Sequence, residues 1–139
     1  MATYNGVNAA KIAAITPSTI LSPGLQGGNV RVLTDTYVGL GTESATETIA
    51  LGGALPVGAT ILWGSLTCDT TGNTPDLGDG VTADLYIDEA TDNAVTMFND
   101  TVNGIGSTIA STTTQFTLTL DAAVTAAGVI TLVVFYTVE

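Results

Sequence analysis

Short segments of alternating polarity, separated by turn-forming residues, dominate the sequence from residue 30 onward. The clearest is Thr114 to Asp121. Its apolar residues Phe116, Leu118 and Leu120 fall on one side of an extended chain, and threonines fall on the other. This period of two is typical of a half-buried strand, and no useful helical period occurs after residue 15. We expect seven strands: Val30 to Val38, Thr46 to Leu51, Thr60 to Asp69, Val81 to Glu89, Val95 to Phe98, Thr114 to Asp121 and Val129 to Val138.

Seven short strands separated by Gly, Asn, Pro and Asp predict an all-β fold, an antiparallel β-sandwich or barrel, rather than alternating strands and helices. The 139 residues suit one domain, and 45% of them are hydrophobic, which is enough for one core. Because only 11% of the residues are charged, Thr, Ser, Asn and Gly must cover most of the surface. Threonine favours strands because its branched side chain suits a pleated surface.

Residues 1–29 differ in composition, and we expect them to form an irregular N-terminal arm ahead of a sandwich domain at 30–139. Asn8 to Ile15 is long enough for two turns of weak helix, after which prolines and glycines prevent a long regular element. The arm contains the apolar residues Ile12, Ile15, Ile20 and Leu21. These side chains either pack on the arm's own domain or contact a neighbouring subunit, and the sequence leaves both open.

Two of the expected strands are apolar on both sides and therefore need cover on both sides. In Thr60 to Asp69 the apolar residues Leu62, Leu66 and Cys68 are expected to face the core. In Val129 to Val138 the even-numbered residues are expected to face the core. The residues left on the opposite sides are Ile61, Trp63, Val129, Val133 and Phe135. Their cover is either the chain's own arm and loops or a subunit interface, where aromatic residues are enriched.

The charge balance is strongly acidic, because Lys11 and Arg31 stand against 13 carboxylates and give a net charge of −11. Nucleic-acid binding depends on basic residues that displace counterions, so we expect neither nucleic acid nor an anionic membrane as a partner. The acidity either keeps a sparsely charged domain soluble or attracts a basic surface or a cation. The start of the chain lacks the basic and apolar regions of a signal peptide. The longest apolar run anywhere in the chain, Val129 to Val138, is too short to span a bilayer.

Residue types that support catalysis are scarce. The chain has no histidine, which excludes Ser-His-Asp and Cys-His arrangements and the usual zinc sites. The single cysteine, Cys68, is expected to be a buried hydrophobe. The sequence has neither a phosphate-binding loop nor a dinucleotide fingerprint. We therefore expect a non-enzymatic protein without a cofactor or a bound metal.

Carboxylates remain, and eight of them fall between residues 69 and 100. Two carboxylates are the acid and base of a glycosidase, but such a site also needs aromatic platforms and a deep cleft. The loop at 69–80 offers oxygen ligands for calcium, although its spacing does not match an EF-hand. These ligands are Asp69, Asn73, Asp76 and Asp79. The alternative interpretation is a solvated loop that uses Asp and Asn to form turns.

Three stretches of the sequence resemble small virion proteins of tailed bacteriophages. They are the start Met1-Ala2-Thr3-Tyr4-Asn5-Gly6-Val7, the turn and strand from Ala54 to Asp69, and the C-terminal strand from Ala127 to Tyr136. The resemblance implies a jelly-roll-like β-sandwich on the outside of a capsid, commonly as a trimer, with no catalytic residues.

The function expected from the sequence is therefore structural. We expect a decoration (cement) protein that stabilises the capsid exterior of a tailed phage and is assembled in the host cytoplasm. Its partners would be the major capsid protein and further copies of itself, most simply in a homotrimer. The alternatives are a tail or head-fibre component and a carbohydrate- or receptor-binding module, because β-sandwiches commonly host such sites on their loops.

Overall fold

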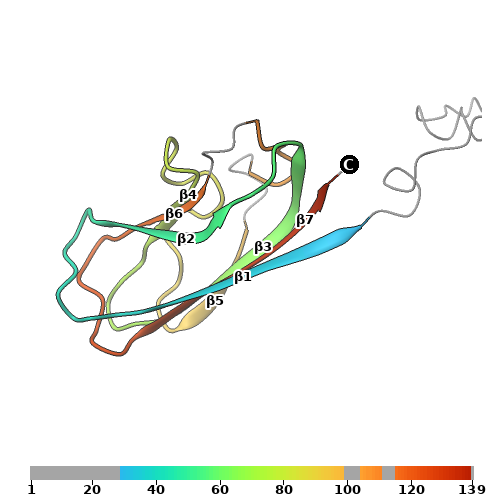
Figure 1. Ribbon diagram of the computed structural model, residues 1–139. Coiled ribbons are helices and arrows are strands. Elements are labelled where there is room, and N and C mark those ends of the chain that lie inside the picture. Colours follow the sequence, from blue (N-terminus) through green and yellow to red (C-terminus); the bar gives the residue numbers. More distant parts are fainter. Residues whose placement is uncertain (1–28, 99–103, 111–114, 139) are drawn as a thin grey trace, which may run out of the picture.

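The computed structural model describes residues 29–98, 104–110 and 115–138, and within them all regular structure is β-strand (Figure 1). The strands are β1 (Val30–Val38), β2 (Thr48–Ala54), β3 (Ala59–Asp69), β4 (Asp76–Gly78), β5 (Ala94–Met97), β6 (Gln115–Thr119) and β7 (Val129–Val138). They form a four-stranded sheet, β1-β7-β3-β5, and a three-stranded sheet, β2-β6-β4. The two packed antiparallel sheets confirm the predicted all-β sandwich.

Successive strands alternate between the two sheets, so that odd-numbered strands build the larger sheet and even-numbered strands the smaller one. The first and last strands are neighbours, since β1 pairs with β7 without a register shift along its whole length. This wrapping, in which the chain crosses from sheet to sheet and its ends meet, is the connectivity of a jelly roll. It places β1 at one edge of the larger sheet, with β7 and β3 at its centre.

The core lies between the two sheets and consists of apolar side chains. From the larger sheet, alternate residues of β3 and β7 point inward, among them Leu66 and Leu132, which are fully buried. From the smaller sheet, the inward residues predicted in β6 and just after it are confirmed as buried. Tyr86 lies between Phe98 and Phe116, with ring centroids 5.1 and 5.0 Å away. These three aromatic rings form one cluster within the core.

The predicted strand from Val81 to Glu89 is wrong. Its alternation assigns Tyr86 and Ile87 to opposite faces, yet both are buried, whereas Val81 is 92% exposed. The Oδ1 of Asp79 accepts hydrogen bonds from the backbone N–H groups of Val81 and Thr82, at 2.9 and 2.8 Å, and so turns the chain. In the described chain the segment keeps one isolated bridge, from Ile87 to Leu77 of β4.

The short strand β4 lies in the segment that the sequence indicated as a loop. It pairs with β6 and packs closely under the turn that follows it. A Cβ atom added to Gly78 would come within 1.8 Å of the backbone oxygen of Thr82 and 2.6 Å of that of Ala83. Glycine is needed here because the backbone of the turn approaches the strand too closely for any side chain.

We expect Gly78→Ala to lower the free energy of unfolding by about 1–3 kcal/mol, because the added methyl group forces two backbone segments apart. Urea denaturation monitored by tryptophan fluorescence measures this change. An unchanged denaturation midpoint would show that the turn after β4 can move to admit the methyl group without a loss of stability.

Cys68 is buried in the core, as predicted. Burial, followed by the nearby charge of Asp92, raises the pKa of the Cys68 thiol to about 12. The thiol is therefore protonated at neutral pH and lacks the thiolate character of a reactive cysteine. Its position supports a role in packing.

The predicted N-terminal arm lies outside the described residues except for Asn29. The weak helix expected at Asn8 to Ile15 and the candidate interface residues Ile12, Ile15, Ile20 and Leu21 are part of that segment. The first strand begins at Val30, where the sequence predicted it. No helix of the described residues is long and apolar enough to cross a membrane.

Candidate docking face

One surface of the larger sheet carries most of the exposed large apolar side chains of the described chain. Alternate residues of β1, β3, β5 and β7 point away from the smaller sheet, and the strand register aligns them in shared rows. We call this surface the outer face. Its apolar residues are Val30, Val32, Val38, Leu62, Trp63, Val95, Met97, Val129, Val133 and Phe135. The other exposed large apolar residues among those described are Leu40, Val57 and Val81, which lie in loops.

A β-bulge in β3 changes which of its residues reach the outer face. The register with β7 shifts between Ile61, which pairs with Tyr136, and Trp63, which pairs with Phe135. Leu62 is the extra residue and is 40% exposed, whereas Ile61 is fully buried. The sequence assigned these two residues the other way round, because a strict period of two takes no account of a bulge. Ile61 is therefore a core residue and not a candidate for an interface.

Trp63 and Phe135 are paired on adjacent strands of the outer face. Their ring centroids are 5.1 Å apart and the rings are tilted by 41°. Val32 of β1 pairs with Phe135 from the other side, so that three apolar side chains form one row across the sheet. Val129 and Val133 lie on the same face of β7 and are half-buried. The structure thus brings together the candidates predicted in β3 and β7, apart from Ile61.

The outer face is almost free of charge in a chain whose net charge is −11. Among the outward residues of its four strands, Asp69 at one end of β3 is the only charged one, and the polar remainder is Thr and Ser. Seven of its apolar residues are between 38% and 60% exposed. Exposed apolar residues gathered on one face of a sheet indicate an interaction site.

Most of the outer face was not among the residues predicted from the sequence. Val30, Val32 and Val38 are contributed by β1, and Val95 and Met97 by β5. Alternation places each of them on one side of its own strand but does not say which strands are neighbours. The missing information is the sheet order, which depends on contacts between residues far apart in the sequence.

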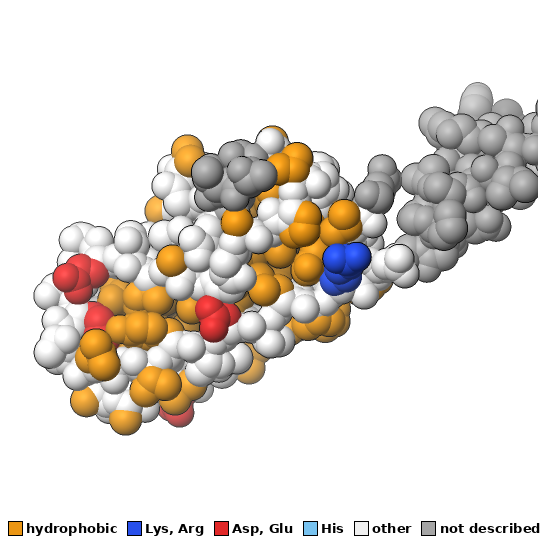
Figure 2. Space-filling view, in the orientation of Figure 1, with side chains coloured by type: hydrophobic (Ala, Val, Ile, Leu, Met, Phe, Trp, Pro, Cys, Tyr) orange, Lys and Arg blue, Asp and Glu red, His pale blue; other side chains and the backbone are white. Residues whose placement is uncertain are grey.

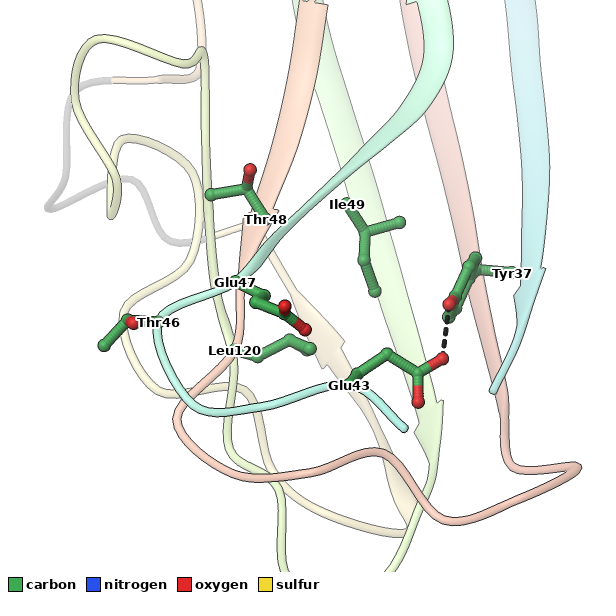
Figure 3. Close-up of a pocket in the computed structure, with 7 residues that line it drawn as sticks. All are labelled: Tyr37, Glu43, Thr46, Glu47, Thr48, Ile49 and Leu120. Carbon is green, nitrogen blue, oxygen red and sulfur yellow. Dashed lines mark hydrogen bonds between the residues drawn. The ribbon is translucent and has the colours of Figure 1, made fainter. Parts of the chain in front are cut away.

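A pocket opens at the end of the sandwich where β1 finishes and β2 begins (Figure 3). Figure 2 shows hydrophobic side chains exposed at this end, with acidic side chains beside them. The residues that line the pocket are Tyr37, Glu43, Thr46, Glu47, Thr48, Ile49 and Leu120. Two carboxylates beside a pocket can in principle act as a general acid and a general base, so we consider what Glu43 contacts.

Glu43 is fully occupied with holding the loop between β1 and β2. Its Oε1 accepts hydrogen bonds from the backbone N–H of Leu40, at 2.7 Å, and from the hydroxyl of Tyr37. Its Oε2 accepts from the N–H groups of Gly41 and Thr42, at 2.9 and 3.1 Å (Figure 3 shows the bond to Tyr37). The Leu40 N–H and then the Tyr37 hydroxyl lower the pKa of Glu43 to about 2. Glu43 is therefore ionised at neutral pH and has no proton to donate as a general acid.

We expect Glu43→Gln to weaken the acid sensitivity of the fold. The pKa of Glu43 is about 2 in the folded protein and near 4.5 when the side chain is free. Its contribution to stability is thus complete above pH 4.5 and is lost as the pH falls toward 2, with the uptake of at most about one proton. Urea denaturation between pH 7 and pH 2 measures the slope. Identical slopes for the variant and the parent chain would contradict the low pKa.

The loop at 69–80 does not collect its oxygen atoms around one point. Asp76 accepts a hydrogen bond from the backbone N–H of Glu89 at 2.8 Å, and Asp79 caps the turn after β4. Asn73 is buried, and its Nδ2 donates to the backbone oxygen of Ala122 at 2.9 Å. The described residues contain no group of three or more acidic or cysteine side chains placed to hold a metal ion. The hydrogen bonds of Asp76 and Asp79 support the turn-forming interpretation of the loop.

Comparison with solved structures finds similar folds in two phage capsid structures. A chain of the capsid asymmetric unit of cyanophage Pam1 superposes with a TM-score of 0.68 over 89% of this chain and 96% of that chain, at 23% identity. The chain shares its fold with a capsid component. A second match, to a chain in the acidic stable capsid structure of Helicobacter pylori bacteriophage KHP30, has a TM-score of 0.54 at 15% identity. It covers 78% of this chain and 87% of that one.

Comparisons at the level of sequence give no further relatives. No family model matches the chain, and no curated protein matches it. The likeness to the two capsid chains therefore concerns the fold.

Proposed function

We propose that this chain is a structural virion protein that decorates and stabilises the capsid of a tailed phage. In this proposal it is a non-enzymatic cement protein on the capsid exterior, assembled in the host cytoplasm. It binds the major capsid protein and further copies of itself, most simply as a homotrimer. The domain at 30–139 supplies the rigid sandwich, and the arm at 1–29 supplies additional contacts.

The observation that carries the proposal is the outer face on a fold shared with phage capsid chains. A cement protein must bury apolar surface against its neighbours while the rest of it stays soluble. The outer face supplies apolar surface on which Asp69 is the only charged residue among the described outward residues of the four strands. This distribution of charge suits a protein that is dissolved before assembly and bound afterwards.

The contacts of the acidic residues also support a structural role. Glu43 holds a loop, and Asp76 and Asp79 hold turns. Asp35, which points inward from the edge strand β1, accepts a hydrogen bond from the backbone N–H of Gly52 at 2.6 Å and so links the two sheets. Carboxylates that accept hydrogen bonds from backbone N–H groups stabilise loops and the edge strand, which is a structural role rather than a catalytic one.

Quantitative mass spectrometry of purified phage particles that carry this gene tests the proposal. A cement protein is expected in hundreds of copies per particle, in proportion to the major capsid protein. A handful of copies per particle would favour the tail or receptor-binding alternative. Absence from washed particles would contradict every virion role.

A further inference from the structure

We propose that the outer face of one copy is covered by the N-terminal segment, residues 1–28, of a neighbouring copy. This inference deepens the proposed function, on which it rests, by naming the partner of the outer face. Each copy would then donate its segment to one neighbour and receive a segment from another. Contacts of this head-to-tail kind form a closed ring, such as a trimer, when the rotation between successive copies closes.

The distribution of charge along the chain favours this occupant. All 13 carboxylates lie at or beyond Asp35, so Lys11 is the only charged side chain in residues 1–28. The remainder of the chain combines Arg31 with those 13 carboxylates and has a net charge of −12 (1 − 13). A second sandwich approaching the outer face would bring its negative charge with it, whereas the N-terminal segment brings a weakly positive one.

The apolar content of the segment also matches the outer face. The segment has five branched aliphatic residues of the Ile and Leu type, namely Ile12, Ile15, Ile20, Leu21 and Leu25. The outer face offers the Trp63–Phe135 pair and valines on three of its strands for such side chains to contact. Contact between the segment and the outer face would remove apolar surface of both from water, which is favourable.

The length of the segment and the place where it ends allow the contact. It joins the sheet at Val30, an exposed residue at the edge of the outer face that is paired with Thr137 and lies one row from Phe135. Twenty-eight residues reach up to about 90 Å when extended, whereas the ten residues of β7 span about 33 Å. The segment is therefore long enough to leave its own sandwich and cross a neighbouring one.

The occupant is assigned to a neighbour rather than to the same copy because of the proposed function. A segment folded back on its own outer face would leave that face unavailable to any subunit. When the segment of one copy binds the outer face of another, the same side chains are covered and the two subunits are also joined.

Two defective full-length variants that complement each other test this inference in solution, without phage particles. The segment variant carries Ile12→Ser, Ile15→Ser, Ile20→Ser and Leu21→Ser and keeps its outer face. The face variant carries Trp63→Ser and keeps its segment. Light scattering at micromolar concentrations is expected to show an oligomer for the parent chain, monomers for each variant alone, and a two-chain complex in their equimolar mixture.

Several results would overturn the inference. They are a parent chain that stays monomeric, a segment variant that assembles like the parent chain, and a mixture in which both variants remain monomers. Thermal unfolding verifies that each variant is folded, and Val32→Asp, at a more exposed position of the same row, replaces Trp63→Ser if the latter unfolds. The copy number in particles tests the proposed function separately, so the two can fail independently.

Discussion

Replacing Leu132 with alanine is expected to lower the free energy of unfolding by about 3 kcal/mol, within the range of 2–5 kcal/mol for buried leucines. Leu132 is fully buried at the middle of the central strand β7 and faces the smaller sheet. Its pairing partner on β3, Leu66, is also fully buried. Two flanking strands hold the backbone there, so the cavity left by the lost atoms has little room to collapse.

The neighbouring residue Val133 provides the matched control. It belongs to the same strand but points to the outer face, where it is half-buried. Val133→Ala is expected to cost about 1 kcal/mol or less when the protein is monomeric, because the side chain is half-buried and water can reach the space left by the removed methyl groups. Urea denaturation at low protein concentration compares the two variants. Equal losses of stability would mean that both faces of β7 are packed within one copy, which would contradict an available outer face.

Introducing a charge on the outer face is expected to have the largest effect on assembly. Val32 is 53% exposed and lies in the row of Phe135 and Trp63. Val32→Asp would bury an unpaired carboxylate in an apolar contact and is expected to weaken attachment to the particle by about 30-fold or more, as at an interface hot spot of about 2 kcal/mol. Sedimentation of particles with labelled protein measures the bound fraction.

Val57→Asp is the control for this experiment, because Val57 has almost the same exposure, 51%, and lies in the turn before β3, outside the four strands that form the outer face. Both variants gain one negative charge, so any effect of net charge on attachment is the same for the two. Attachment is expected to be nearly unchanged for Val57→Asp. Equal weakening by both variants would show that net charge, and not the outer face, controls attachment.

The strands predicted best from the sequence are those with one apolar side facing the core and those that form a continuous apolar run. The bounds of β1 and β7 agree with the prediction, and the buried residues in and beside β6 were assigned correctly. The segment from Val81 to Glu89 alternates equally well, but Asp79 turns the chain before a ladder forms. Alternation reports which residues suit a strand, whereas local side-chain bonds to the backbone decide whether the strand continues.

The candidate site was predicted in part. Trp63, Val129, Val133 and Phe135 were assigned to the outward side of their strands, and the structure confirms that placement. Ile61 was assigned wrongly because the bulge at Leu62 is set by the pairing of β3 with β7. The contributions of β1 and β5 depend on the sheet order, for which a single sequence has no local signal.

A cryo-electron microscopy map of the phage particle, at a resolution that shows side chains, tests both proposals most directly. We expect regularly repeated copies on the outside of the head, with Trp63 and Phe135 covered by another polypeptide. We further expect the covering density to trace to residues 1–28 of an adjacent copy. Copies found only at the tail would refute the cement function, and copies on the head with an outer face open to solvent would refute the proposed docking.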